Sequence, residues 1–330
     1  MKKTVCELFA GVGGFRCGLN NIKTSKDYGK KEKWDTVWFS QWEPAEKKTQ
    51  YAHDCYVYRF GTCLDKNGED TTNYNIEEVD KSTIPDFNLL VGGFPCQDYS
   101  VASSLATSKG LEGKKGILWW SIRETVEKKQ PPFILLENVD RLLKSPAKQR
   151  GRDFGIILAC LRDEGYTVEW RVINAAEYGY QQRRRRTFIF AYRNDTKYAE
   201  DVVDAIQYIK GAKKLARKSS GGHEYIFSEG AIPMVDDEDK PARTMLTSEG
   251  GFNRSTHIVK DKKTGNIRLL TAGETERIQG FPTDHTKYCL VNGETVEMPL
   301  NKRRFMMGNA LVVNLIADME ETLDKIFEKE

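Results

Sequence analysis

The sequence lacks the features that mark membrane proteins, disulfide scaffolds and zinc proteins. It has no apolar run that approaches the length of a bilayer span. Its seven cysteines are widely spread, and no two are separated by only two residues, which argues against a zinc site and against a disulfide framework. The N-terminus carries no long apolar core with a small-residue cleavage site, so we expect no signal peptide and a cytoplasmic protein.

The composition fits a globular protein that can bury a large core. Of 330 residues, 39% are hydrophobic and 30% are charged, which predicts one large domain with a smaller one beside it. The net charge of +3 is too small to indicate a partner, but basic residues gather at 183–186, 210–218 and 302–304. Such clusters either follow phosphates or form solvated faces.

Short apolar segments alternate with helical patterns over the first 193 residues. The strand-like segments are 5–9, 36–40, 89–92, 133–137, 168–174 and 187–192. This alternation predicts an α/β fold with a doubly wound, mostly parallel sheet, whose ligands bind outside the carboxyl ends of the strands.

The alternation stops after residue 193. Residues 194–240 are rich in lysine and contain a Ser-Gly turn and an acidic patch, whereas residues 309–327 have apolar side chains at helical spacing. We therefore expect a large domain over 1–193 and a small domain over 194–300. The segment 301–330 returns to the large domain, with an amphipathic helix over 309–327.

Cys96 stands directly after Gly92, Gly93, Phe94 and Pro95, at the end of an apolar stretch. We interpret the glycines as permitting a sharp turn and the proline as fixing one dihedral, which holds the thiol at a mouth of the fold. A lone cysteine is more often a small buried hydrophobe. The neighbouring motifs decide between these interpretations.

A glycine-rich loop, 9–15, follows the first strand, as in loops that cradle nucleotide-like cofactors. The dinucleotide fingerprint needs a glycine three positions after Gly13, and Arg16 stands there, which disfavours an NAD-dependent dehydrogenase. Trp42 and Glu43 follow the second strand. They suit an adenine face and a ribose, or else a core position and the acid at a helix start.

Charged residues also follow two later strands. Glu137 ends an apolar run, and a buried carboxylate is costly unless it is used or paired. Alternation places Arg184 and Arg186 on one face of the following basic run, and Arg183 and Arg185 on the other, so one pair can point into the cleft. A solvated edge is the other interpretation of this run.

Together these motifs resemble the cytosine-5 DNA methyltransferase family, bacterial or phage, of the restriction-modification type. In the family's order the chain contains Phe-Ala-Gly-x-Gly-Gly-Phe, Gly-Phe-Pro-Cys-Gln, Glu-Asn-Val, Gln-x-Arg-x-Arg and Gly-Asn-Ala. Several ordered motifs are more specific than one. The resemblance implies the S-adenosylmethionine-dependent methyltransferase fold. It makes 1–193 the catalytic and cofactor-binding domain and 194–300 the target-recognition domain.

The resemblance also implies roles for the catalytic groups. Cys96 adds to carbon 6 of a cytosine flipped out of duplex DNA, which prepares carbon 5 to take a methyl group from S-adenosylmethionine. Glu137 contacts ring nitrogen 3 and the exocyclic amine, and Arg186 supports the base carbonyl. Arg184 helps to position the site.

For the cofactor, the resemblance implies contacts from several segments. They are Phe9, Ala10, Gly11, Gly13, Gly14, Phe15, Trp42, Glu43, Asn75, Pro95, Leu118, Asn309 and Ala310. Asn75 replaces a frequent Asp, and its amide oxygen can accept the same bond from the adenine amine. Trp42 and Glu43 stand in the reverse order of some relatives.

The DNA contacts are expected in a lid over 97–116 and in the short recognition region. The candidates are Gln97, Ser100, Lys115, Arg217, Lys218, Ser248 and Arg254. Lys115 replaces a frequent Arg, which keeps the charge and loses the fork geometry. We expect a monomer without a metal or a membrane partner, nucleoid-associated on DNA. A restriction endonuclease that acts on the same site is a candidate partner.

Two alternatives stay open from the sequence. An RNA (tRNA) cytosine-5 methyltransferase typically carries Pro-Pro-Cys-Gln and a Cys-Phe-Thr insert, whereas this chain has Phe94 before Pro95 and no such insert. A catalytically silent DNA-binding protein on the same scaffold is disfavoured because Cys96, Glu137 and Arg186 are intact.

Overall fold

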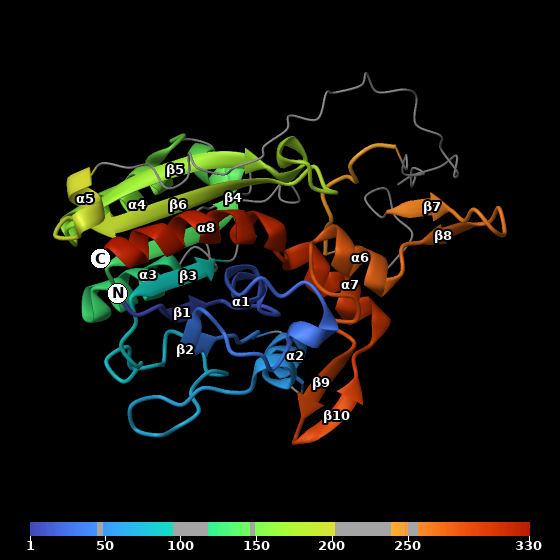
Figure 1. Ribbon diagram of the computed structural model, residues 1–330, viewed down its shortest axis with the longest axis horizontal. Helices are drawn as coiled ribbons and strands as arrows, with labels where there is room; N and C mark the ends of the chain where they lie inside the picture. The colour runs from blue at the N-terminus through green and yellow to red at the C-terminus, as the bar shows by residue number, and fades with distance from the viewer. Residues whose placement is uncertain (45–48, 95–117, 146–148, 202–238, 248, 250–256) are drawn as a thin grey trace.

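The computed structural model describes residues 1–44, 49–94, 118–145, 149–201, 239–247, 249 and 257–330. A six-stranded sheet forms its centre (Figure 1). Its strands are β1 (Thr4–Leu8), β2 (Asp35–Ser40), β3 (Leu89–Gly93), β4 (Phe133–Val139), β5 (Tyr166–Asn174) and β6 (Arg185–Arg193). They lie in the order β2-β1-β3-β4-β6-β5. These strands confirm the six predicted segments.

The sheet is mostly parallel with one reversed strand. β1 pairs in parallel with β2 and β3, and β3 pairs in parallel with β4. β6 runs antiparallel to both β4 and β5. The carboxyl ends of β1, β3 and β4 and the start of β6 therefore meet at one edge of the sheet, which is where ligands bind in this class of fold.

Eight α-helices and three 3₁₀ turns accompany the strands in the described part of the chain. They are α1 (Gly14–Leu19), η1 (Ser25–Asp27), α2 (Tyr51–Phe60), α3 (Leu118–Lys129), η3 (Asp140–Lys144), α4 (Arg152–Asp163), η4 (Ala175–Tyr178), α5 (Lys197–Asp201), α6 (Ala272–Ile278), α7 (Leu300–Asn309) and α8 (Val313–Lys329).

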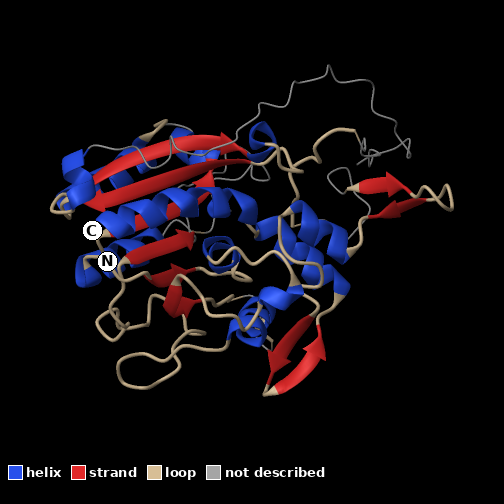
Figure 2. Cartoon of the chain, in the orientation of Figure 1, coloured by secondary structure: helices blue, strands red, loops and turns tan. Residues whose placement is uncertain are grey.

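Helices cover both faces of the sheet, as Figure 2 shows. α1 and α8 bury their apolar side chains in one core, and α3 and α4 contribute to a second core on the opposite face. Within β3, Leu89 and Val91 belong to the first core and Leu90 to the second. Both faces being covered explains why the central strands are continuous apolar runs.

The elements between β6 and α8 form two small antiparallel hairpins next to α6 and α7 (Figure 1). The strands are β7 (Ile258–Lys260) with β8 (Ile267–Leu269), and β9 (Tyr288–Val291) with β10 (Glu294–Glu297). The division at residues 193 and 300 stays a prediction. The expected C-terminal amphipathic helix is confirmed, although α8 begins at Val313 because α7 ends at Asn309 and Ala310 is extended.

α1 and α8 pack with their backbones almost in contact. A Cβ added at Gly18 would lie 2.4 Å from Ile316 Cβ and 2.9 Å from the Val313 carbonyl oxygen. A Cβ added at Gly14 would lie 3.0 Å from Leu311 Cγ. Two glycines one turn apart therefore let the helix after the first strand lie directly under the start of α8.

Polar contacts fix the rest of α8 against the N-terminal segment. The Trp34 indole N–H donates to Glu320 Oε1 at 2.8 Å. The Lys33 ammonium lies 2.8 Å from Glu320 and 2.7 Å from Asp324. The Met1 amino group donates to the Phe327 carbonyl at 2.8 Å, so the two termini are held side by side.

Gly18→Ala tests this helix contact against a matched substitution, Gly155→Ala. The added methyl group at position 18 overlaps Ile316, so we expect the variant to lose about 1–3 kcal/mol of stability. Gly155 lies in α4, and no atom lies within 4 Å of the position that a Cβ would take there, so alanine should add about 0.5–1 kcal/mol. Urea unfolding followed by circular dichroism measures both. Equal stability of the two variants would contradict the close α1–α8 packing.

Candidate active site

Glu137 and Arg186 meet where β4, β3 and β6 lie side by side. Glu137 pairs with Gly93 across β3 and β4, and Val139 pairs with Arg186 across β4 and β6. The Arg186 Nε lies 2.8 Å from Glu137 Oε1, and the two side chains are 14% and 11% exposed. The structure therefore brings together two of the predicted catalytic groups as a largely buried ion pair.

The glycines before Cys96 serve a different purpose from the one expected. Gly92 and Gly93 lie inside β3, and neither has a positive φ, so the expected sharp turn at these two residues is wrong. A Cβ at Gly92 would lie 2.9 Å from the Leu8 carbonyl oxygen, and one at Gly93 would lie 3.4 Å from Glu137 Oε2. They leave room for the neighbouring strand and for the Glu137 carboxylate.

Asn138 is a site residue that the sequence reasoning missed. Its amide Nδ2 donates to the Phe94 carbonyl at 3.3 Å, and it is 1% exposed. Pro95, Cys96, Gln97, Ser100 and Lys115 lie outside the described residues. Asn138 thus fixes the backbone two residues before Cys96, and its place inside Glu-Asn-Val was the available signal.

Arg184 acts away from the Glu137 carboxylate. It precedes β6, is 2% exposed, and donates from Nη1 to the Met245 carbonyl and from Nη2 to the Gly308 carbonyl, both at 3.1 Å. Gln182 accepts from the Met245 N–H at 3.0 Å. Arg184 therefore joins the start of β6 to two later segments. The predicted alternation holds, because Arg184 is buried and Arg186 half-buried, whereas Arg183 and Arg185 are exposed.

The glycine loop has the backbone of a tight, side-chain-poor turn. Phe9, Gly11 and Gly13 have φ values of 54°, 58° and 85°. The Gly11 N–H donates to Gln41 Oε1 at 2.7 Å, so the end of β2 holds the loop. The sequence reasoning passed over Gln41, although it directly precedes Trp42.

Glu7 supports the loop from inside the sheet. It is 1% exposed at the end of β1 and accepts from the Tyr56 hydroxyl at 3.0 Å. Burial raises the pKa of the Glu7 carboxyl to about 7, although the bond from Tyr56, the Arg16 charge and the Phe15 and Arg16 N–H groups oppose the rise. Only the structure shows this buried acid as part of the site.

Further predicted cofactor residues follow β2 and lie at the end of α7. Trp42 is 39% exposed, which excludes core packing as its role. The Glu43 N–H donates to Gln50 Oε1 at 2.7 Å, and the Glu43 carbonyl accepts from Gln50 Nε2 at 2.9 Å, so the Gln50 side chain holds the Glu43 backbone. Leu311 packs on Gly14, which places the preceding Asn309 and Ala310 beside the loop.

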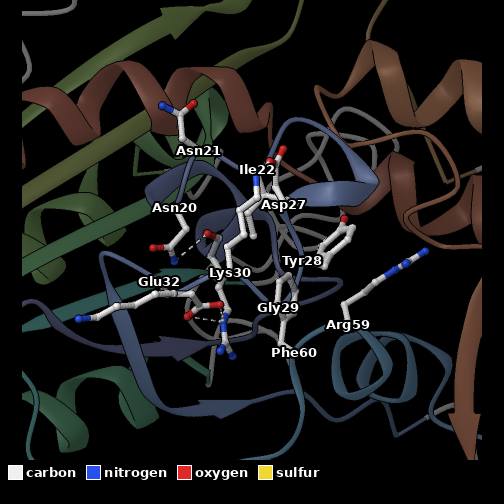
Figure 3. A pocket seen from close by; sticks show the side chains of 12 residues that line it. Asn20, Asn21, Ile22, Asp27, Tyr28, Gly29, Lys30, Glu32, Arg59 and Phe60 are labelled. Carbon is white, nitrogen blue, oxygen red and sulfur yellow. Dashed lines mark hydrogen bonds and ion pairs between the residues drawn. The ribbon is translucent and has the colours of Figure 1, made fainter.

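Asn75 and Leu118 occupy less central positions. Asn75 Oδ1 accepts from the Glu77 N–H at 3.3 Å, and its second lone pair can still accept another donor. Leu118 begins α3. A pocket of about 350 Å³ beside α1 is lined by residues such as Tyr28, Arg59 and Phe60 (Figure 3), and none of the predicted cofactor residues lines it.

Four of the described cysteines are poor nucleophiles because they are buried. Burial raises the pKa of the Cys6 and Cys17 thiols well above the usual range, that of Cys55 to about 12 and that of Cys289 to about 11. Within the described ranges, no three His, Cys, Asp or Glu side chains are grouped to hold a metal. The helices described there include none long and apolar enough to cross a membrane.

Glu7→Gln should change how stability depends on pH. The folded chain binds the Glu7 proton more tightly than the unfolded chain, so wild-type stability contributed by this group is complete below pH 4.5 and is lost as pH rises through about 7. The variant avoids this loss and should gain about 3 kcal/mol relative to wild type between pH 4.5 and 8. Urea unfolding at several pH values measures the difference, with exposed Glu294→Gln as the control. Parallel curves for wild type and Glu7→Gln would contradict it.

Comparisons with known proteins agree with this geometry. The family model of the C-5 cytosine-specific DNA methylases matches residues 3–221 and 197–325. The Type II methyltransferase M.Sau3AI of Staphylococcus aureus is 38% identical, over 98% of this chain and 96% of that protein. M.NgoBI of Neisseria gonorrhoeae is 28% identical, over 99% of this chain and 94% of that protein.

Solved structures show the same fold at low sequence identity. The Entamoeba histolytica methyltransferase EhMeth has a TM-score of 0.62 at 16% identity, over 100% of this chain and 99% of that one. The S. pombe Dnmt2 methyltransferase has a TM-score of 0.60 at 16% identity, over 99% and 98%. The fold, the ordered motifs and the family match lead to one conclusion: this chain belongs to the C-5 cytosine-specific DNA methylases and is a DNA cytosine-5 methyltransferase.

Proposed function

We propose that the chain methylates carbon 5 of a cytosine within a short sequence of duplex DNA, with Cys96 as nucleophile and S-adenosylmethionine as methyl donor. The observation that carries the proposal is the Glu137–Arg186 pair, which lies beside the end of β3. Cys96 follows three residues after the end of β3 in the sequence. The Type II names of the relatives support a place in a restriction-modification system, and so a possible cognate endonuclease.

The roles follow from the chemistry of the pyrimidine ring. The Cys96 thiolate bonds to carbon 6, and the ring electrons move toward carbon 5, which becomes nucleophilic. Loss of the carbon 5 proton to a base after methylation lets the carbon–sulfur bond break and regenerates the thiolate. Base flipping must precede these steps, at a cost of a few kcal/mol of unstacking.

Glu137 is proposed to hold the flipped base on its ring nitrogen 3 side. Its Oε1 faces Arg186, and its Oε2 faces the side-chain-free surface of Gly93. Arg186 uses Nε toward Glu137 and Nη1 toward the Arg185 carbonyl. We assign Nη2 to the base carbonyl. A preorganised charge pair of this kind stabilises charge that develops during addition.

The residues present fit S-adenosylmethionine. The glycine loop offers backbone in a left-handed conformation with little side-chain cover, and the exposed indole of Trp42 lies at the end of the next strand. When bound, the cofactor supplies an electrophilic methyl group. Glu43, Asn75, Leu118, Asn309 and Ala310 are proposed to hold it together with 9–15 and Pro95.

DNA recognition is proposed for residues outside the described ranges. Gln97, Ser100 and Lys115 are assigned to the lid over the flipped base. Arg217, Lys218, Ser248 and Arg254 are assigned to phosphates and base edges. We further propose a cytoplasmic monomer that associates with the nucleoid when it binds DNA.

Methyl transfer to two substrates tests the activity. The chain is incubated with labelled S-adenosylmethionine and either unmethylated duplex DNA or transfer RNA, and the product is mapped at base resolution. We expect label at carbon 5 of cytosine in one short DNA sequence. Label confined to RNA, or absent from both, would contradict the proposal.

Cys96→Ala tests the nucleophile. Removing the thiol prevents addition to carbon 6, so methyl transfer should fall by on the order of 10³-fold or more. Unfolding and cofactor affinity should stay near wild type. Cys160→Ala is the matched control and should keep activity. Cys160 lies in α4 and packs against the second core. Methylation by Cys96→Ala at the wild-type rate would show that another group attacks.

A further inference from the structure

His285 connects the C-terminal part of the chain to the glycine loop. It follows α6 and is fully buried. Its Nε2 lies 2.6 Å from the carbonyl oxygen of Val12, in the middle of the loop, and its Nδ1 lies 2.5 Å from the Tyr28 hydroxyl. Both ring nitrogens therefore have a partner at hydrogen-bond distance.

The partners define the proton on the imidazole. A carbonyl oxygen can only accept, so Nε2 must carry the hydrogen that is shared with Val12. Burial lowers the pKa of His285 to about 3, helped by the Arg59 charge, which keeps the ring neutral at physiological pH. Nδ1 is then an acceptor, and the Tyr28 hydroxyl donates to it.

The backbone around His285 is held from two sides. The Arg59 Nε donates to the His285 carbonyl at 2.7 Å. Glu276 accepts from the Asp284 N–H at 2.7 Å and from the Thr286 N–H at 2.9 Å. The Phe281 ring stacks on the imidazole with centroids 4.6 Å apart. These contacts fix the position of the His285 backbone and ring independently of the bond to the glycine loop.

The glycine loop has a second anchor at the end of the neighbouring strand β2. Gly11 is held by Gln41, and Gly13 accommodates the Phe60 ring, since a Cβ at Gly13 would lie 2.6 Å from it. Val12 lies between these two glycines, and its carbonyl is turned toward His285. Without that bond, a buried backbone acceptor would lose its partner, which costs more than an ordinary hydrogen bond contributes.

We propose that His285 is a positioning residue for the cofactor, which holds the Val12 carbonyl so that residues 11–14 keep the conformation that receives S-adenosylmethionine. Tyr28, on the wall of the pocket in Figure 3, donates to Nδ1 and so helps to hold the ring in the orientation that brings Nε2 to Val12. The inference rests on the proposed cofactor role of the glycine loop. It makes cofactor affinity depend on a side chain far away in the sequence.

Two replacements of His285 separate its two hydrogen bonds. In His285→Gln the amide Nε2 can still donate toward Val12. In His285→Asn the shorter side chain can still accept from Tyr28 but cannot reach the Val12 carbonyl. The asparagine variant should raise the KM and the Kd for S-adenosylmethionine about tenfold, with kcat at saturating cofactor within about twofold of wild type. The glutamine variant should stay within about threefold in all of these constants.

The measurements are calorimetric titration with S-adenosylmethionine, steady-state kinetics and urea unfolding of the full chain. Tyr28→Phe serves as a second variant and should raise Kd about threefold, because the imidazole loses the hydrogen bond that helps to orient it. Equal Kd values for wild type, His285→Asn and Tyr28→Phe would overturn the inference alone. Absence of cofactor binding by the wild-type chain would overturn the proposed function and this inference with it.

Discussion

The contact between α1 and α8 is the constraint on which the site depends. Because Gly14 and Gly18 carry no side chains, α8 and the residues just before it pack closely on α1. Ile316 of α8 contacts Gly18, and Leu311 contacts Gly14. The glycine loop directly precedes α1, so this contact fixes the first turn of the fold relative to the last helix. The end of α7 at Asn309 and the following Ala310 directly precede Leu311, so they also lie next to the start of α1. Segments from both ends of the chain thereby lie side by side.

Buried polar contacts then set the position of the elements between β6 and α8. Arg184 binds the carbonyls of Met245 and Gly308, and Arg303 lies 3.0 Å from Glu276. Buried ion pairs add little net stability compared with an apolar replacement, but loss of one partner is strongly destabilising. Their value here is positional, because each buried donor must keep its acceptor within hydrogen-bond distance. The apolar cores supply stability, and these contacts supply the register.

Local patterns predicted what depends on local patterns. Apolar runs located the six strands, and ordered motifs identified the glycine loop, Glu137 and Arg186, although not the ion pair that the last two form. The need for glycine at position 92 could not be predicted, because a side chain there would collide with the Leu8 carbonyl of a neighbouring strand. His285 was missed for the same reason, since its partners at Val12 and Tyr28 are remote in sequence. Side chains that act through tertiary contacts leave no periodic signal.

Two adjacent residues at the end of β4 position the Glu137 carboxylate, which is proposed to contact the base, and the backbone that leads to the proposed nucleophile, Cys96. Consecutive residues of a strand point to opposite faces. Glu137 accordingly faces Arg186, whereas the Asn138 amide holds the Phe94 carbonyl. One short stretch of backbone thus controls the carboxylate and the chain entering Cys96. Reacting groups must be held within about 0.5 Å of their productive geometry. Adjacent residues of a fully buried strand therefore hold the Glu137 carboxylate and the Phe94 carbonyl, two residues before Cys96.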